Sequence, residues 1–253
     1  MTRFGVGWLV CALLSFAPAA PRADEIDVNE LVRRAEDALR GKTAEMKMRM
    51  TITTPRWTRE LVIRSWDDQA GDRSFSRVLE PPKDKGTGFL RDHDAFWTWL
   101  PKVERAMRIP PSMMLQPWMG SDFTNDDLVK ESSLRKDFVA RVDRRSESPA
   151  GWWLILEVKP GVVGRWARID LLVGDDELPI EERHFDRKGR LARTMRFGEV
   201  RVLGGRRLPT RIALVPADKE GETTEMRYLE ASFDVALPAD TFSLSRLEQA
   251  RPE

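Results

Sequence analysis

Apolar and polar residues alternate along most of this 253-residue chain, as they do in β-strands with one buried face. Met46, Met48 and Met50 give the clearest example, since each is followed by a polar residue and the pattern continues to Ile52. The same period predicts further strands over Arg59–Trp66, Arg73–Leu79, Gly88–Arg91, Ala95–Leu100, Glu104–Ile109, Phe138–Arg145, Trp152–Val158, Arg165–Val173, Ile180–Phe185, Leu191–Val202, Arg207–Val215 and Thr223–Phe233. Turn-forming residues separate these segments, which favours antiparallel pairing of successive strands. The tail Leu237–Phe242 is predicted to close the last strand.

Helical periodicity occurs at two places. From Asp24 to Arg40 the apolar residues recur on one stripe, with Asp27 or Asn29 as the N-cap and Gly41 as the end of the helix. A second, short helix is predicted from Asn125 to about Glu131. Because these helices are few beside so many strands, the fold class is mainly β, an antiparallel sheet curled on itself.

The predicted sheet has one polar and one apolar face, and the apolar face needs a cover. The first helix and the connector around Met113–Leu128 are the segments that can supply it. So thin a cover over a large curved sheet predicts a hollow, with a fully packed core as the alternative. Neither a repeat nor a linker interrupts the pattern, so residues 24–253 are predicted to form a single domain.

The connector is rich in large apolar side chains. Met113, Met114, Leu115, Trp118 and Met119 lie within seven residues, among several prolines. Exposed apolar patches of this kind are rare in soluble proteins. The segment must therefore be covered by protein, cover a cavity itself, or contact an apolar partner.

Four motifs follow one another along residues 86–128: Gly86-Thr87-Gly88-Phe89-Leu90, Trp97-Thr98-Trp99-Leu100-Pro101, Met119-Gly120-Ser121-Asp122-Phe123 and Asp127-Leu128. Their order resembles the periplasmic outer-membrane lipoprotein-sorting family, the LolA-like proteins. The resemblance implies an unclosed, strongly curved antiparallel β-barrel, covered by a lid of short helices and holding acyl chains in its hollow. The segment Ile109–Trp118 departs from the more polar connector expected in that family, which bears on the cargo more than on the fold.

The N-terminal residues have the pattern of a secretory signal peptide. Arg3 precedes an apolar stretch from Phe4 to Phe16, and small residues follow. Cleavage after Ala23 is predicted, with Ala19 as the alternative, so that residues 1–23 are removed. The stretch is short for a membrane span of about 30 Å. The single cysteine of the chain lies inside this signal, so we expect a periplasmic mature protein without disulfides or lipidation.

The charge balance excludes some partner classes. The chain has 42 basic and 41 acidic residues, and removal of Arg3 and Arg22 with the signal leaves a mature net charge of −1. A near-neutral, evenly mixed charge argues against a nucleic acid partner. We expect the mature protein to be a monomer.

The sequence offers little for catalysis. His93 and His184 are the two histidines, and neither has metal-ligand spacing; Arg91–Asp94 is typical of a solvated turn. Asp122, Asp126 and Asp127 lack the spacing of a calcium loop and are predicted to cap or flank the short helix. The Gly86-Thr87-Gly88 segment lacks the rest of a phosphate loop, and a close backbone approach or a β-bulge is the simpler interpretation. We therefore expect no enzyme activity, no catalytic residue, no metal and no cofactor.

Flexible methionines can adapt to ligands of different shape, and tryptophans offer a large apolar face with one N–H donor. The candidate ligand-binding residues are Met46, Met48, Met50, Phe89, Trp97, Trp99, Met113, Met114, Trp118, Met119 and Phe123. The alternative for each is an ordinary core position. Four charged residues beside the connector, Lys102, Glu104, Arg105 and Arg108, fit either a solvated strand face or a contact with an anionic headgroup.

The predicted function is a periplasmic carrier that binds lipid or lipoprotein acyl chains and passes them across the envelope. By resemblance, an inner-membrane exporter and an outer-membrane acceptor are its expected partners. The alternative is an envelope protein-interaction module with a solid core and no cargo. A cavity large enough for an acyl chain distinguishes the two.

Overall fold

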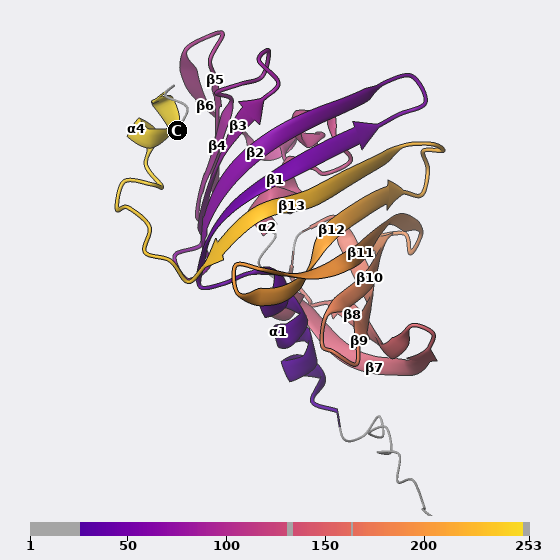
Figure 1. Ribbon diagram of the computed structural model, residues 1–253. Helices are drawn as coiled ribbons and strands as arrows, with labels where there is room; N and C mark the ends of the chain where they lie inside the picture. Colours follow the sequence, from indigo (N-terminus) through magenta and orange to yellow (C-terminus); the bar gives the residue numbers. More distant parts are fainter. Residues whose placement is uncertain (1–25, 131–133, 163, 250–253) are drawn as a thin grey trace, which may run out of the picture.

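The computed structural model describes residues 26–130, 134–162 and 164–249, and in these ranges thirteen strands form one sheet (Figure 1). The strands are β1 (Thr43–Thr53), β2 (Thr58–Asp68), β3 (Arg73–Glu80), β4 (Gly88–Asp92), β5 (Ala95–Leu100), β6 (Arg105–Arg108), β7 (Phe138–Glu147), β8 (Ala150–Val158), β9 (Trp166–Gly174), β10 (Pro179–Asp186), β11 (Leu191–Leu203), β12 (Arg206–Pro216) and β13 (Thr223–Phe233). Every predicted strand is confirmed, with small shifts at its ends. The predicted signal peptide lies outside the described residues.

The strand order explains why the sheet stays open. It reads β6-β5-β4-β3-β2-β1-β13-β12-β11-β10-β9-β8-β7. Strands β1 to β6 run from the centre to one edge and form the first half of the sheet, and strands β7 to β13 run from the opposite edge to the centre and form the second half. All the neighbouring strands pair antiparallel, and β13 pairs with β1 at the centre of the sheet. Strands β6 and β7 are the two free edges, which confirms the unclosed antiparallel fold.

The connector between β6 and β7 has to cross the sheet, because these strands lie at opposite edges. Its described residues include the short helices η2 (Pro111–Met113), η3 (Trp118–Gly120), α2 (Asn125–Lys130) and α3 (Leu134–Asp137). Its apolar residues Met114, Trp118 and Met119 pack against the buried methionines of β1. The inner face of the first half of the sheet is therefore filled by the connector.

Helix α1 (Val28–Leu39) covers the second half, where Val32 and Ala35 pack against β8 and β9. It begins at Val28 because the Asp27 side chain accepts hydrogen bonds from the backbone N–H groups of Asn29 and Glu30, both at 3.1 Å. The Glu36 carboxylate accepts from Leu134 N at 3.1 Å and from Arg135 Nε at 2.7 Å. These bonds tie α1 to α3.

The sequence pattern predicts that the C-terminal tail closes the last strand. In the structure the tail instead crosses to the outer face of the first half of the sheet (Figure 1). There helix α4 (Leu244–Glu248) places Leu247 among aromatic residues of β2, β3 and β5. Arg77 holds this helix: its guanidinium donates to the backbone oxygens of Arg246 at 2.8 Å and Leu247 at 3.0 Å. Gly88 lies beneath this contact: a Cβ there would lie 2.8 Å from Arg77 Nη1 and 2.9 Å from Leu247 Cδ1, so both side chains pack closely on the glycine.

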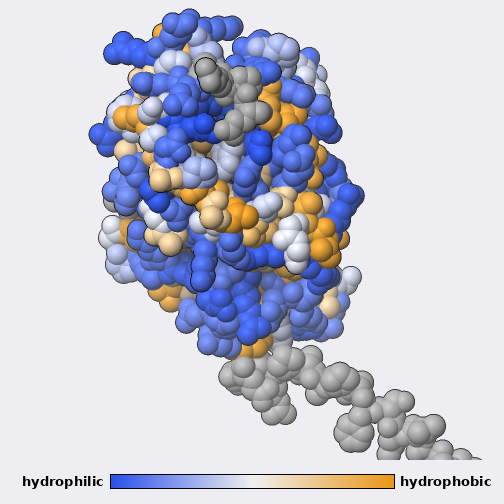
Figure 2. Space-filling view, turned by 60° about the vertical axis from the view of Figure 1, so that its left-hand side comes forward, coloured by the Kyte–Doolittle hydropathy of each residue, from blue (hydrophilic) through white to orange (hydrophobic). Residues whose placement is uncertain are grey.

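Charged residues make up 33% of the chain, and many of them lie on its surface. The face shown in Figure 2 is mainly hydrophilic, with smaller hydrophobic areas between the charged side chains. In the described part of the chain, none of the helices has the length and hydrophobicity needed to cross a membrane.

Candidate functional site

A cavity of about 230 Å³ lies where the two halves of the sheet and the helices meet. Its floor is the inner face of β9 to β13, and α1, α2 and α3 border it opposite the sheet. Apolar side chains that line it include Leu39, Leu134, Ile169, Met195, Ile212 and Met226. The connector fills much of the neighbouring half of the inner face, so most of the hollow lies under α1 and α3, with Met46 of β1 and Phe123 of the connector at its border.

The structure distributes the predicted ligand-binding residues over four places. Met46 and Phe123 line the cavity. The packed cluster beneath the connector contains Met48, Met50, Phe89, Trp118, Met114 and Met119. Trp97 and Trp99 lie in the cluster under α4, and Met113 is 46% exposed. Contact of these residues with a ligand stays a prediction.

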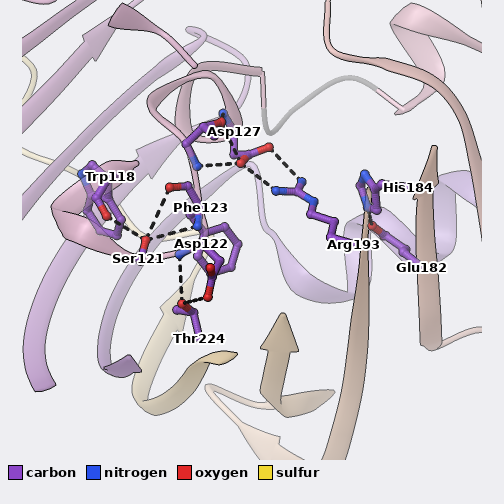
Figure 3. Close-up of polar contacts among 10 residues, drawn as sticks. Trp118, Ser121, Asp122, Phe123, Asp127, Glu182, His184, Arg193 and Thr224 are labelled. Carbon is purple, nitrogen blue, oxygen red and sulfur yellow. Dashed lines mark hydrogen bonds and ion pairs between the residues drawn. The ribbon is translucent and has the colours of Figure 1, made fainter. Parts of the chain in front are cut away.

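A buried ion pair ties α2 to the cavity floor (Figure 3). Arg193 of β11 donates from Nη1 to Asp127 Oδ2 at 2.7 Å and from Nη2 to Asp127 Oδ1 at 2.8 Å. Burial raises the pKa of the Asp127 carboxyl, but the charge and hydrogen bonds of Arg193, aided by Thr124, outweigh it and lower the pKa. Asp127 therefore stays ionised at neutral pH.

Thr124 completes this arrangement as the N-cap of α2. Its backbone N–H and its hydroxyl both donate to Asp127 Oδ2 at 2.8 Å, and its hydroxyl accepts from Asp127 N at 3.3 Å. The predicted capping role of Asp127 is confirmed. Its second role, as the partner of Arg193, is absent from the sequence-based expectation because the two residues lie 66 positions apart.

His184 lies directly opposite Arg193 in the β10–β11 register, and both side chains line the cavity. His184 Nε2 lies 2.9 Å from Glu182 Oε2. Trp166 packs against both residues, with its ring 5.0 Å from the imidazole and 4.5 Å from the guanidinium carbon. Burial, and then the charge of Arg193, lower the pKa of His184, so the imidazole is neutral.

The sequence contains one signal for this polar cluster, beyond the alternation that predicts the strands. Glu182 and His184 are two residues apart in a predicted strand, so they share a face. The β10–β11 ladder also shifts register between His184 and Phe185, and such bulges redirect side chains near binding sites. The alternation alone leaves open which face is turned inward.

The Met119–Phe123 motif serves to fix the connector. Ser121 Oγ donates to Trp118 O at 2.7 Å and accepts from Phe123 N at 3.2 Å, which closes a tight turn. Asp122 N donates to Thr224 Oγ1 at 3.0 Å, and that hydroxyl donates back to Asp122 Oδ2 at 2.8 Å. The motif thus joins the connector to β13 and holds Phe123 at the cavity wall (Figure 3).

The other polar candidates lie on the surface, apart from Arg91 at the border of the cavity. His93 is exposed in the β4–β5 turn, as predicted, whereas Arg91 is buried and forms an ion pair with Asp72. Lys102, Glu104 and Arg105 are exposed on the surface near β6, and so is Arg108. Within the described ranges there is no group of three or more His, Cys, Asp or Glu side chains placed to hold a metal ion.

Comparison with known proteins bears on both sequence and fold. A family model described as "-like: Uncharacterized protein" matches residues 70–249. A search of curated proteins gave no match to the chain.

Three solved structures have the same fold. A DUF1329 family protein from Desulfovibrio piger has a TM-score of 0.75 at 19% identity, covering 87% of this chain and 97% of that one. A proposed outer membrane lipoprotein-sorting protein domain from Vibrio parahaemolyticus has a TM-score of 0.74 at 20% identity, covering 90% and 100%. A LolA superfamily protein from Nitrosomonas europaea has a TM-score of 0.73 at 18% identity, covering 87% and 99%. The resemblance to LolA-like proteins is confirmed at the level of the fold.

Proposed function

Since the chain belongs to the family whose model spans residues 70–249 and has the LolA-like fold, we propose that it is a periplasmic carrier of an acyl chain. The observation that carries this proposal is the apolar cavity between the sheet and helices α1 to α3. Pockets of this kind, mainly apolar with a few converging polar groups, are the usual sites for small ligands. We further propose that the chain is exported by its signal peptide and works with an exporter and an acceptor.

The size of the cavity favours a single acyl chain. Its volume of about 230 Å³ is below the range of roughly 300–1,000 Å³ that is usual for drug-sized ligands. Each buried methylene contributes about 0.8 kcal/mol, so eight of them supply about 6 kcal/mol before the cost of association. Such an affinity suits a carrier, because the ligand must also be released.

Release requires that the helices move away from the sheet. Helix α2 is fixed by the ion pair between Asp127 and Arg193, and α3 by Glu36 of α1. The sheet consists of continuously paired strands, whereas the lid consists of the separate helices α1, α2 and α3. We therefore place the opening motion in the lid and keep the sheet rigid.

Native mass spectrometry with lipid extraction tests the proposal, on mature protein purified from the periplasm without detergent. We expect a bound amphiphile in the wild type. In Met46→Trp the larger side chain enters the cavity, so occupancy should fall at least fivefold. The control is Val202→Trp, which adds the same side chain at a position that is 73% exposed.

Two results would contradict the carrier. One is wild-type protein that is empty on purification and stays empty after incubation with phosphatidylethanolamine and phosphatidylglycerol vesicles. The other is equal occupancy in the wild type and in Met46→Trp. The first result favours the alternative of a protein-interaction module without cargo, and the second shows that the cargo is not held in this cavity.

A further inference from the structure

Two polar atoms in the cavity wall lack a hydrogen-bond partner. Among the described residues, none bonds His184 Nδ1 or Arg193 Nε, although both side chains are otherwise well bonded. His184 is 5% exposed and Arg193 6%, and both line the cavity. Buried polar groups in native proteins are nearly always satisfied, so each of these two atoms needs a partner that a molecule in the adjoining cavity could supply.

The two atoms have opposite hydrogen-bonding character. The imidazole is neutral, and its Nε2–H donates to the Glu182 carboxylate at 2.9 Å, which leaves Nδ1 as an acceptor. Arg193 uses Nη1 and Nη2 on Asp127, which leaves its Nε–H as a donor. Because the two residues are cross-strand neighbours, with Cβ atoms about 5 Å apart, one small group can reach both atoms.

The charges around the cavity disfavour an anionic group at this place. Among the described residues, five arginines and six carboxylates line the cavity. Asp127 takes one N–H from each terminal nitrogen of Arg193 and already neutralises the guanidinium charge, so a second anion would gain little net attraction here. An uncharged group avoids the repulsion and the desolvation cost that a second buried anion would meet.

We propose that His184 and Arg193 bind the uncharged polar head of a single-chain amphiphile, a hydroxyl or a carboxamide, while its aliphatic part lies along the apolar cavity wall. The head accepts a hydrogen bond from Arg193 Nε–H and donates one to His184 Nδ1. Trp166, which packs on both side chains, keeps them in place. This inference rests on the proposed carrier function and specifies its ligand class.

Isothermal titration calorimetry on the mature protein tests the head preference with four ligands of the same chain length. 1-Decanol and decanamide offer a donor and an acceptor, decyl methyl ether offers an acceptor alone, and decanoate is an anion. We expect decanol and decanamide to bind about tenfold more tightly than the ether, as befits one lost buried hydrogen bond. Decanoate should bind more weakly than decanol.

A variant assigns the preference to His184. In His184→Gln the amide nitrogen can still donate to Glu182, while the Nδ1 acceptor is lost. The preference for decanol over the ether should fall below twofold, with ether affinity unchanged. Met195→Leu, an apolar change of similar volume in the same cavity, should keep the full preference.

The outcomes separate this inference from the function on which it rests. If wild-type protein binds none of the four ligands, both the carrier function and the head preference are overturned. Binding of the ether as tightly as decanol, or tightest binding of decanoate, overturns the head preference and leaves the carrier standing. A preference that survives His184→Gln overturns the assignment to His184.

Discussion

The ion pair between Arg193 and Asp127 should be the strongest single electrostatic contact between the lid and the sheet. Its side chains are 7% and 13% exposed, and its geometry is bidentate. In Arg193→Met the buried Asp127 carboxylate loses its counter-charge, which typically costs about 3–5 kcal/mol. That is a large part of the roughly 5–15 kcal/mol by which domains are stable. The variant should still fold, with clearly reduced stability.

A double-mutant cycle isolates the pair from other effects. Asp127→Asn retains an oxygen that can accept from Thr124, so the cap of α2 is kept while the charge is removed. The double variant Asp127→Asn/Arg193→Met has no unpaired charge, so it should be more stable than Arg193→Met alone. We expect a coupling energy of about 2 kcal/mol or more from urea unfolding followed by circular dichroism.

A control pair lies on the same hairpin. Arg190 and Asp186 form an ion pair in the β10–β11 turn, where the Arg190 side chain is 71% exposed. Exposed pairs contribute about 0.2–1 kcal/mol, so the same cycle there should give a coupling below 1 kcal/mol. If Arg193→Met costs less than 1 kcal/mol, or the two pairs couple equally, the lid is not fixed by this contact.

Three further predictions concern stability. Burial and the charge of Arg193 lower the pKa of His184 below 6.5, so the unfolded chain binds a proton that the folded chain does not. The free energy of unfolding should therefore fall as the pH drops below 6.5, by up to about 1.4 kcal/mol per pH unit, and His184→Gln should remove this slope in pH-dependent urea titrations. Met46 and Met48 belong to the same packed cluster, but of the two only Met46 also lines the cavity. Met48→Trp should therefore destabilise by about 1–3 kcal/mol, whereas Met46→Trp should cost less than about 1 kcal/mol because the larger side chain has room on the cavity side; equal losses on thermal unfolding would contradict the described boundary of the cavity. Leu247→Ala should cost about 2–5 kcal/mol, and Leu244→Ala, at a position 42% exposed, should cost little; similar urea midpoints for the two variants would show that α4 is not docked.

Local patterns made the strands predictable. The inward side chains of β1 are buried from Ala44 to Ile52, as the alternation indicates, because a two-residue period fixes which residues share a face. The first helix was also predictable from its stripe and its cap at Asp27. Both features depend on residues that are close together in the sequence.

Features that depend on distant residues were not predictable in this way. Helix α4 is short, and its docking depends on Arg77, about 170 positions earlier. The cavity cluster joins α2 to β11 and depends on how the sheet curves. The methionines of β1 show the limit most clearly: Met46 and Met48 are equivalent in the pattern and share one packed cluster, but of the two only Met46 also borders the cavity.

The strand order gives a physical reason for this division. Because β6 and β7 are opposite edges, the connector must cross the inner face, and its large apolar residues reach the first half before the second. Past Phe123 the chain turns into α2, whose Asp127 meets Arg193 in place of further apolar packing. The polar cluster thus occupies the place where continued apolar side chains would have filled the hollow. An apolar space with a neutral acceptor and an arginine N–H in its wall is suited to a molecule with one aliphatic chain and one uncharged polar head.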